Sequence, residues 1–344
     1  MELDLWHLYE LMLRSRLFEE LVNDLWDDGR ISGEMHMGIG EEGIVAGVVD
    51  HMQDGDAIAL DHRGTPPMIM RGVPARALLA EMLGRADGLC AGQGGHMHLY
   101  APEYLAASSG IVGSSGPAAA GFALAGQMQR PGSIAVAFFG EGAINQGMLL
   151  ESLNLAAVWD LPVLFVCKDD GWAIFTPTET TTRSSPVERA RGFGLTAVSA
   201  DGRDVMATWR AAGKLLEKVR AGEGPAFLHA SCVRPHAHFL GDPLLRTAKG
   251  KRSMGVGGLL RSLTRVKGDS LRSRARTSAE LTALMRRCVA DRDFSGHDPL
   301  ERAREQLAGL DKIRLENLEE ETALDMGRET GSLLEETAVR ERQR

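Results

Sequence analysis

The sequence predicts an α/β fold in which a mostly parallel central sheet is flanked by helices. Two short apolar runs, residues 134–139 and 163–167, have the length and composition of buried strands. Between them, apolar residues recur at helical spacing, at Met148, Leu149, Leu153, Ala156 and Ala157. A strand, a helix and a second strand in succession favour a parallel pair with a right-handed crossover. We therefore expect residues 133–182 to form the centre of the fold.

Length and composition limit the classes of protein to consider. With 344 residues, 44% of them hydrophobic, the chain can form one large α/β domain, alone or with appendages. Its net charge of -8 gives no reason to expect nucleic acid as a partner. The four cysteines lie far apart without Cys-x-x-Cys spacing, which is typical of reduced thiols. Acidic residues near the N-terminus and the lack of any apolar run near 18 residues predict a cytoplasmic protein without signal peptide or membrane span.

Two helices and a loop are predicted before the first strand. Residues 3–27 carry an apolar stripe at helical spacing, and Gly29 is the expected end of this helix. A loop broken by glycines and carrying His36 follows, and then a second helix through residues 45–49. By itself His36 is typical of a surface or hydrogen-bonded histidine.

A short strand, residues 57–60, leads into the charged sequence Asp61-His62-Arg63. A charged turn is one interpretation of this sequence. Arginine at a strand end is also a suitable clamp for a diphosphate, because its planar fork can bond two oxygens.

The next stretch contains two helices and a histidine pair. We expect a helix from Pro74 to residue 82 and a second helix of small residues at 117–126, which suits close packing against another helix or a partner subunit. Between them lie His96 and His98. Because no third ligand follows at a suitable spacing, the sequence does not favour a zinc site here.

The strand ends of the central unit carry its most informative polar residues. Gly140-Glu141-Gly142 follows the first strand, where glycines allow backbone N–H groups to approach an anion. Asp170 follows the second strand, and the carboxyl ends of neighbouring parallel strands border the ligand crevice of such sheets. Two carboxylates beside an anion site suggest magnesium bridging a diphosphate. The pattern lacks the third glycine and the Gly-Lys-Ser/Thr sequence of nucleotide loops.

Further strands are expected at residues 193–199 and 226–233, with a helix at 205–219 between them. His236 and His238 follow the last strand and are titratable near neutral pH. A loop with solvent-bonded histidines is the alternative interpretation.

The chain is expected to divide into three parts. Residues 1–245 form the α/β domain with its N-terminal helix. Residues 246–296 are a basic insertion, rich in glycine and serine at its start, that we expect to be mobile; docking of an acidic partner is the alternative. Residues 297–344 are expected to be a charged helical segment.

Several of these motifs resemble one enzyme family. The sequences GEGAINQG, ESLNLAAVWDLPVLFVC and GWAI are similar to the alpha subunit of the thiamine diphosphate-dependent first component of 2-oxo acid and acetoin dehydrogenase complexes. The resemblance covers about residues 5–245 and a segment at Asp298. It implies the thiamine diphosphate-binding fold, with thiamine diphosphate and Mg²⁺ as cofactors.

The resemblance also implies roles for individual residues. Magnesium would be held by Glu141, Asp170 and the backbone carbonyl of Trp172, although the family has aspartate and asparagine where this chain has Glu141 and Asp170. His36 would line the active-site entrance, and His36 and His238 are the catalytic candidates. The cofactor-binding residues would be His62, Arg63, Gly110, Val112, Gly142, Ala143, Asp170 and His238.

The implied activity is cleavage of a 2-oxo acid or acetoin, with transfer of the acyl unit to a lipoyl group. A beta subunit would supply the glutamate that activates the cofactor, in an assembly of two alpha and two beta chains serving a lipoyl-bearing acyltransferase. Two alternatives to this activity remain open. The first is a thiamine diphosphate enzyme with another carbonyl substrate and acceptor, and the second is a non-catalytic relative that acts as an assembly subunit.

Overall fold

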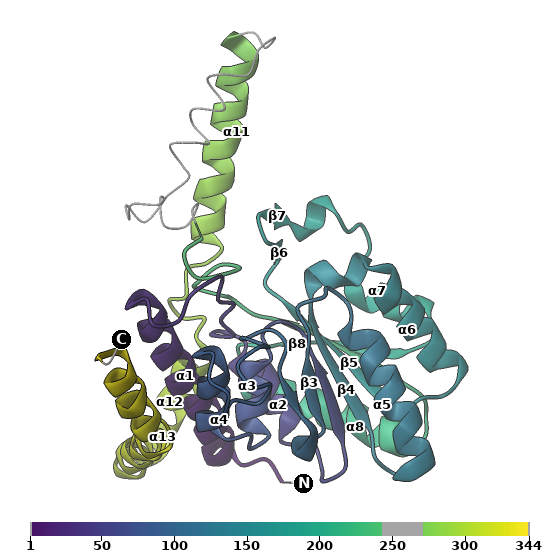
Figure 1. Cartoon of the computed structure of the whole chain (residues 1–344). Helices are drawn as coiled ribbons and strands as arrows, with labels where there is room; N and C mark the ends of the chain where they lie inside the picture. The colour runs from purple at the N-terminus through teal and green to yellow at the C-terminus, as the bar shows by residue number, and fades with distance from the viewer. Residues whose placement is uncertain (1, 243–270, 343–344) are drawn as a thin grey trace.

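A seven-stranded sheet forms the centre of the protein, seen in a computed structural model that describes residues 2–242 and 271–342 (Figure 1). The strand order is β2-β3-β1-β4-β5-β9-β8, with β2 antiparallel to β3 and every other neighbouring pair parallel. The predicted α/β class with a mostly parallel sheet is therefore confirmed. The strands are β1 (Ala57–Leu60), β2 (Tyr100–Ala101), β3 (Ala106–Ser108), β4 (Ala135–Gly140), β5 (Val163–Asp169), β8 (Thr196–Asp201) and β9 (Ala226–Ser231).

The predicted central unit is present, with one correction. Strands β4 and β5 pair in parallel, and helix α6 (Gly147–Val158) connects them. The Gly140-Glu141-Gly142 sequence does not open this helix. A separate 3₁₀ turn, η2 (Glu141–Asn145), comes first, because Gln146 is extended and interrupts the helical backbone. A small hairpin of β6 (Trp172–Ala173) and β7 (Thr176–Pro177) follows β5.

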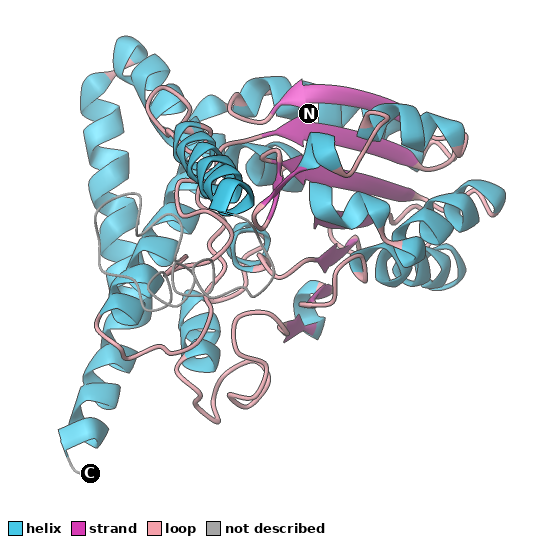
Figure 2. Ribbon diagram, turned by 90° about the horizontal axis from the view of Figure 1, so that it is seen from above, coloured by secondary structure: helices cyan, strands magenta, loops and turns pink. Residues whose placement is uncertain are grey.

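Helices cover both faces of the sheet (Figure 2). Alternate residues of each strand point to opposite faces, so Phe139 joins one apolar cluster and Phe138 the other. On the first face lie α5 (Ser115–Gln129), α6 and α7 (Pro186–Gly192). On the second lie α1 (Leu5–Asp27), α2 (Glu42–Val49), α3 (Thr65–Met70), α4 (Ala75–Met82) and α8 (Val205–Arg220).

The small residues of α5 allow close helix packing, as the sequence suggests. A Cβ atom on Gly116 would lie 2.8 Å from Leu149 Cδ1 of α6. Since real Cβ contacts are longer than this, a side chain at this position would require Leu149 to shift.

One predicted strand begins late. The sequence suggests a strand from residue 193, but β8 begins at Thr196, because α7 ends at Gly192 and residues 193–195 form the turn between them. Pro186 and a reciprocal capping box between Ser185 and Glu188 start α7. The turn that follows α7 therefore contains residues 193–195, which the sequence had assigned to the strand.

The C-terminal part contains three helices, α11 (Leu271–Ala290), α12 (Pro299–Leu310) and α13 (Lys312–Arg342). Helices α12 and α13 pack on α1, and Arg16 of α1 donates two hydrogen bonds of 2.9 Å to Asp298, the N-cap of α12. Helix α11 projects from the body of the protein (Figure 1). The predicted three-part division stays a prediction, and much of the predicted insertion, residues 246–270, lies outside the described residues. None of the described helices combines the length and apolarity required to cross a membrane.

Candidate active site

The carboxyl ends of five neighbouring strands border one cavity of about 310 Å³. Segments that follow β3, β1, β4, β5 and β9 each contribute to its wall, as expected where parallel strands end at the same edge. The side chain of Asp170 is buried and does not line the cavity. Its backbone N–H donates a hydrogen bond to Glu141 Oε2. The other residues singled out in the sequence line the cavity: His36, His62, Arg63, Gly110, Val112, Glu141, Gly142, Ala143, Trp172 and His238.

Two buried carboxylates, Glu141 and Asp170, lie together at the ends of β4 and β5. The backbone N–H of Asp170 donates to Glu141 Oε2 at 3.3 Å, and Asp170 Oδ1 accepts from the backbone N–H of Trp172 at 3.1 Å. Oδ2 of Asp170 is buried and has no hydrogen-bond partner in the part of the chain that the structure describes. An unpartnered buried carboxylate oxygen beside a second carboxylate is suited to a hard divalent cation such as Mg²⁺.

The buried position of Glu141 and the nearby carboxylate of Asp170 affect the protonation of Glu141. Burial, followed by the negative charge of Asp170, raises the pKa of Glu141 to about 8. Burial also raises the pKa of Asp170, although Arg234, Arg292 and Arg63 oppose the rise. Without a cation, the Glu141 carboxyl is therefore mostly protonated at pH 7.

Magnesium binding should release a proton below pH 8. The cation requires ionised Glu141, so at pH 7 binding displaces the carboxyl proton, and affinity should rise with pH until it levels above about pH 8. Titration calorimetry in two buffers with different ionisation enthalpies measures the released proton. A Glu141→Gln variant should bind magnesium weakly and release none. Equal proton counts at pH 6.5 and pH 9 would contradict this account of Glu141.

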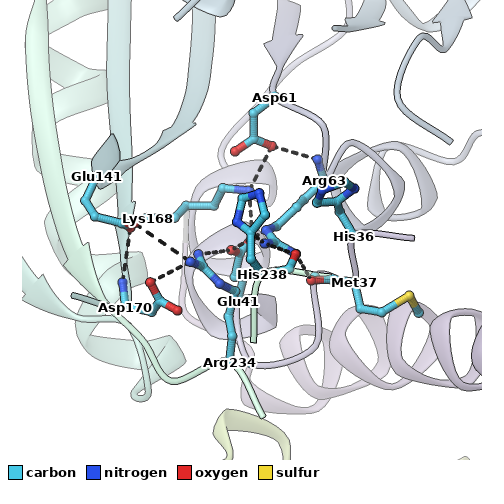
Figure 3. A network of polar contacts seen from close by, with 12 residues as sticks. His36, Met37, Glu41, Asp61, Arg63, Glu141, Lys168, Asp170, Arg234 and His238 are labelled. Carbon is cyan, nitrogen blue, oxygen red and sulfur yellow. Dashed lines mark hydrogen bonds and ion pairs between the residues drawn. The ribbon is translucent and has the colours of Figure 1, made fainter. Parts of the chain in front are cut away.

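Behind the cavity, three buried cations surround Glu41 (Figure 3). Glu41 lies 2.6 Å from Lys168 Nζ, 3.0 Å from Arg234 Nη1 and 3.6 Å from Arg63 Nε. Burial alone would raise the pKa of Glu41, but the three cations together hold this pKa below its usual value. Lys168 also lies 3.2 Å from Asp61. This network connects the loop before α2 to the ends of β1, β5 and β9.

Arg234 links this network to the carboxylate pair. Its Nη2 lies 2.5 Å from Asp170 Oδ1 and 3.8 Å from Glu141 Oε1 (Figure 3). Part of the negative charge of the pair is therefore already compensated by the chain. The Nε of Arg234 is buried and has no hydrogen-bond partner among the residues that the structure describes.

Arg63 joins two loops at the cavity wall. Its Nη1 donates to the Met37 carbonyl at 2.5 Å, and its Nη2 donates to the His238 carbonyl at 2.7 Å. Each of these nitrogens carries a second N–H, and the side chain lines the cavity. Arg63 thus fixes the positions of the His36 loop and the His238 loop and places positive charge at the cavity.

Three histidine rings face one another at the cavity. The ring of His36 lies 4.6 Å from that of His62 and 4.9 Å from that of His238, and one ring nitrogen of each lies within 4.8 Å of the others. Burial and the charge of Arg63 lower the pKa of His36 to about 2 and that of His238 to about 3. The same causes lower the pKa of His62, so all three rings are neutral at pH 7. Such a triad has the geometry for a metal, but Arg63 and Arg234 favour an anion beside it instead.

Glycines shape the wall of the cavity. A Cβ on Gly142 would lie 3.1 Å from the Cβ of Ala173, and one on Gly110 would lie 3.1 Å from Met97 Sδ. Beside Gly110, Val112 is half exposed. This part of the wall offers backbone and an apolar side chain, which suits a planar ring of a ligand.

Several residues at the site have no clear sequence signal. Glu41 lies in a glycine-rich loop, and only the position of Lys168, at the end of an otherwise apolar strand, could have indicated a buried charge. Of the two histidines in the 92–100 segment, His98 is exposed and His96 is buried against His36.

The end of α11 and the residues after it cover Trp172. The indole Nε1 of Trp172 donates to Asp291 Oδ2 at 3.1 Å, and the guanidinium carbons of Arg292 and Arg287 lie 5.2 and 5.5 Å from the indole ring. A segment distant in sequence thus packs against one of the predicted metal positions.

Comparisons with known proteins found one matching family model and several similar proteins. The sequence model of the "Dehydrogenase E1 component" family matches residues 9–252. Among similar proteins are subunits alpha of acetoin:2,6-dichlorophenolindophenol oxidoreductase. The one from Bacillus subtilis is 38% identical over 72% of this chain and 75% of its own length. The one from Cupriavidus necator is 40% identical over 71% of this chain and 74% of its own length. The pyruvate dehydrogenase E1 component subunit alpha of Zymomonas mobilis is 36% identical over 70% of this chain and 69% of its own.

Proposed function

Because this chain belongs to the dehydrogenase E1 component family, we propose that it is the alpha subunit of a thiamine diphosphate-dependent dehydrogenase. The enzyme would cleave a 2-oxo acid or an α-hydroxy ketone such as acetoin and pass the acyl unit to a lipoyl group. The observation that carries this proposal is the convergence of the Glu141–Asp170 pair with Arg63 and His238 at one cavity.

The residues present fit the cofactor. Glu141, Asp170 and the carbonyl of Trp172 would hold Mg²⁺, since Asp170 Oδ2 is otherwise an orphaned buried oxygen. Arg63, His238 and the backbone N–H groups of Gly142 and Ala143 would bind the diphosphate. His62 is a further candidate, because its buried Nε2 has no hydrogen-bond partner among the described residues.

When bound, thiamine diphosphate supplies the carbon nucleophile and takes up the electrons of the broken carbon–carbon bond. The chain binds, orients and shields it. Gly110 and Val112 would position its aminopyrimidine ring, while His36, whose ring borders the cavity, would face the substrate.

The proposed assembly includes a beta subunit, two copies of each chain, and a lipoyl-bearing acyltransferase as the acyl acceptor. Exposed apolar residues in the cavity wall support a partner on this side: Ile111, Val112 and Ile174. We also propose a cytoplasmic location.

A second candidate is a non-catalytic assembly subunit. The observation that favours it is the 2.5 Å ion pair between Arg234 and Asp170, which compensates one carboxylate without any metal. The unpartnered Asp170 Oδ2 and His62 Nε2 argue against it, because a site without a ligand gains nothing from orphaned polar atoms.

The test is calorimetric titration of thiamine diphosphate with Mg²⁺ into the chain copurified with its beta subunit. We expect saturable binding that a chelator abolishes. Glu141→Gln should weaken binding of the cofactor, because this variant holds the metal weakly, while Glu103→Gln, at an exposed position away from the cavity, should bind as the wild type does. Absence of binding in a well-formed assembly would favour the non-catalytic subunit.

A further inference from the structure

Two hydrogen bonds converge on one nitrogen of His96. The backbone N–H of His36 donates to His96 Nε2 at 3.3 Å, and the ring Nδ1 of His36 lies 2.9 Å from the same atom. The two imidazoles are stacked, with centroids 5.2 Å apart, and both are buried. His96 does not line the cavity, whereas His36 does.

These contacts determine where the protons lie. A backbone N–H can only donate, so His96 Nε2 must be the acceptor and carries no proton. His36 Nδ1, at 2.9 Å from that bare nitrogen, must then carry the proton that it shares with His96. A neutral imidazole has one N–H, so His36 Nε2 is bare. Burial lowers the pKa of His36 to about 2 and that of His96 to about 4, so both rings are neutral at pH 7.

We propose that His96 is a positioning residue that holds His36 in the Nδ1–H tautomer, so that His36 Nε2 accepts the hydroxyl proton of an α-hydroxy ketone substrate. No hydrogen bond to Nε2 of His36 is formed by the described residues, and the ring borders the cavity. This inference rests on the proposed function, which leaves open the choice between a 2-oxo acid and an α-hydroxy ketone.

The two substrate classes place different demands on this nitrogen. Cleavage of an α-hydroxy ketone would break the bond between its ketone carbon and its carbinol carbon, and the bound cofactor would supply the acceptor for that electron pair. The carbinol oxygen becomes the carbonyl of a departing aldehyde, and its proton goes to His36 Nε2. A 2-oxo acid loses carbon dioxide in the corresponding step and releases no proton. A bare nitrogen also attracts a hydroxyl and repels a carboxylate.

The tautomer can be measured without turnover. In the full chain labelled with ¹⁵N at histidine, nuclear magnetic resonance distinguishes protonated from bare ring nitrogens. His36 and His96 should both show the Nδ1–H form. His51 is an internal reference for the opposite form, because its Nε2 lies 2.8 Å from the Trp209 carbonyl and must donate. A His36 signal in the Nε2–H form would overturn the inference.

Two substitutions separate positioning from packing. The side-chain oxygen of Gln in His96→Gln can accept both hydrogen bonds, so this variant should keep the His36 tautomer and most of the turnover. His96→Ala removes the acceptor, and kcat for an α-hydroxy ketone in the assembly should fall on the order of 10- to 100-fold with little change in KM. Equal losses in both variants would indicate a packing role and overturn the proposal.

The outcomes also distinguish this inference from the proposed function. If thiamine diphosphate fails to bind the assembly, the proposed function fails, whatever the tautomer of His36. If the cofactor binds but the assembly turns over a 2-oxo acid and no α-hydroxy ketone, the proposed function stands and the inference fails.

Discussion

Replacing Lys168 with Met should lower the free energy of unfolding by about 3 to 5 kcal/mol, because it removes one partner of a buried ion network. Lys168 is fully buried, and its ammonium group lies 2.6 Å from Glu41 and 3.2 Å from Asp61. Burial opposes its charge, but Asp61 and Glu41 outweigh this effect and raise the pKa of Lys168. Without the ammonium, both carboxylates lose a buried counter-charge. Denaturant unfolding of the purified chain measures the difference.

A matched control is Lys214→Met, the same change at an exposed position of α8. Away from such a network, a surface substitution changes stability by less than about 0.5 kcal/mol. If Lys168→Met were as stable as Lys214→Met, the ion network around Glu41 would not contribute to stability as we describe.

Replacing Arg63 with Ala should weaken binding of thiamine diphosphate and Mg²⁺ by about 100-fold or more, equivalent to roughly 3 kcal/mol. The change removes positive charge from the cavity wall and the two hydrogen bonds that hold the Met37 and His238 carbonyls. The His36 and His238 loops would then lose their shared anchor. Calorimetric titration of the assembly measures the affinity.

Two further variants make this result specific. Arg63→Lys keeps the charge but loses the planar fork, so its affinity should lie between those of the wild type and Arg63→Ala. Arg76→Ala removes an arginine on α4, far from the cavity lining, and should leave affinity unchanged. Unchanged affinity in a folded Arg63→Ala variant would remove Arg63 from the diphosphate site.

Local sequence patterns determined most of the sheet. The apolar runs that become β4 and β5 are unambiguous because strands buried on both faces need continuous apolar sequence. The predicted strand at residues 57–60 coincides with β1. The prediction for β8 was wrong at residues 193–195, because the capping box at Ser185 starts α7 and these residues form the turn that follows this helix.

The sequence also indicated much of the candidate site, for a topological reason. Parallel strands place their carboxyl ends at the same edge, so polar residues such as Arg63, Glu141 and Asp170, each following a strand, were expected to meet. The family resemblance assigned the remaining positions. Titration of the cofactor into the Arg63 and Glu141 variants tests the roles of these residues in binding it.

Only the tertiary structure decided which charges share the interior. Glu41, Lys168 and Arg234 come from segments far apart in the chain, and no local pattern links them. The same holds for Trp172, which is covered by residues that follow α11.

The choice between His96 and His98 was likewise decided by packing. The Ser108 hydroxyl accepts from the Leu99 N–H and donates to the Met97 carbonyl, both at 2.9 Å, which fixes this segment against β3. In that conformation His96 is buried against His36 and His98 is exposed. The sequence supplies two histidines two residues apart, and the contact with strand β3 determines which of them reaches the site.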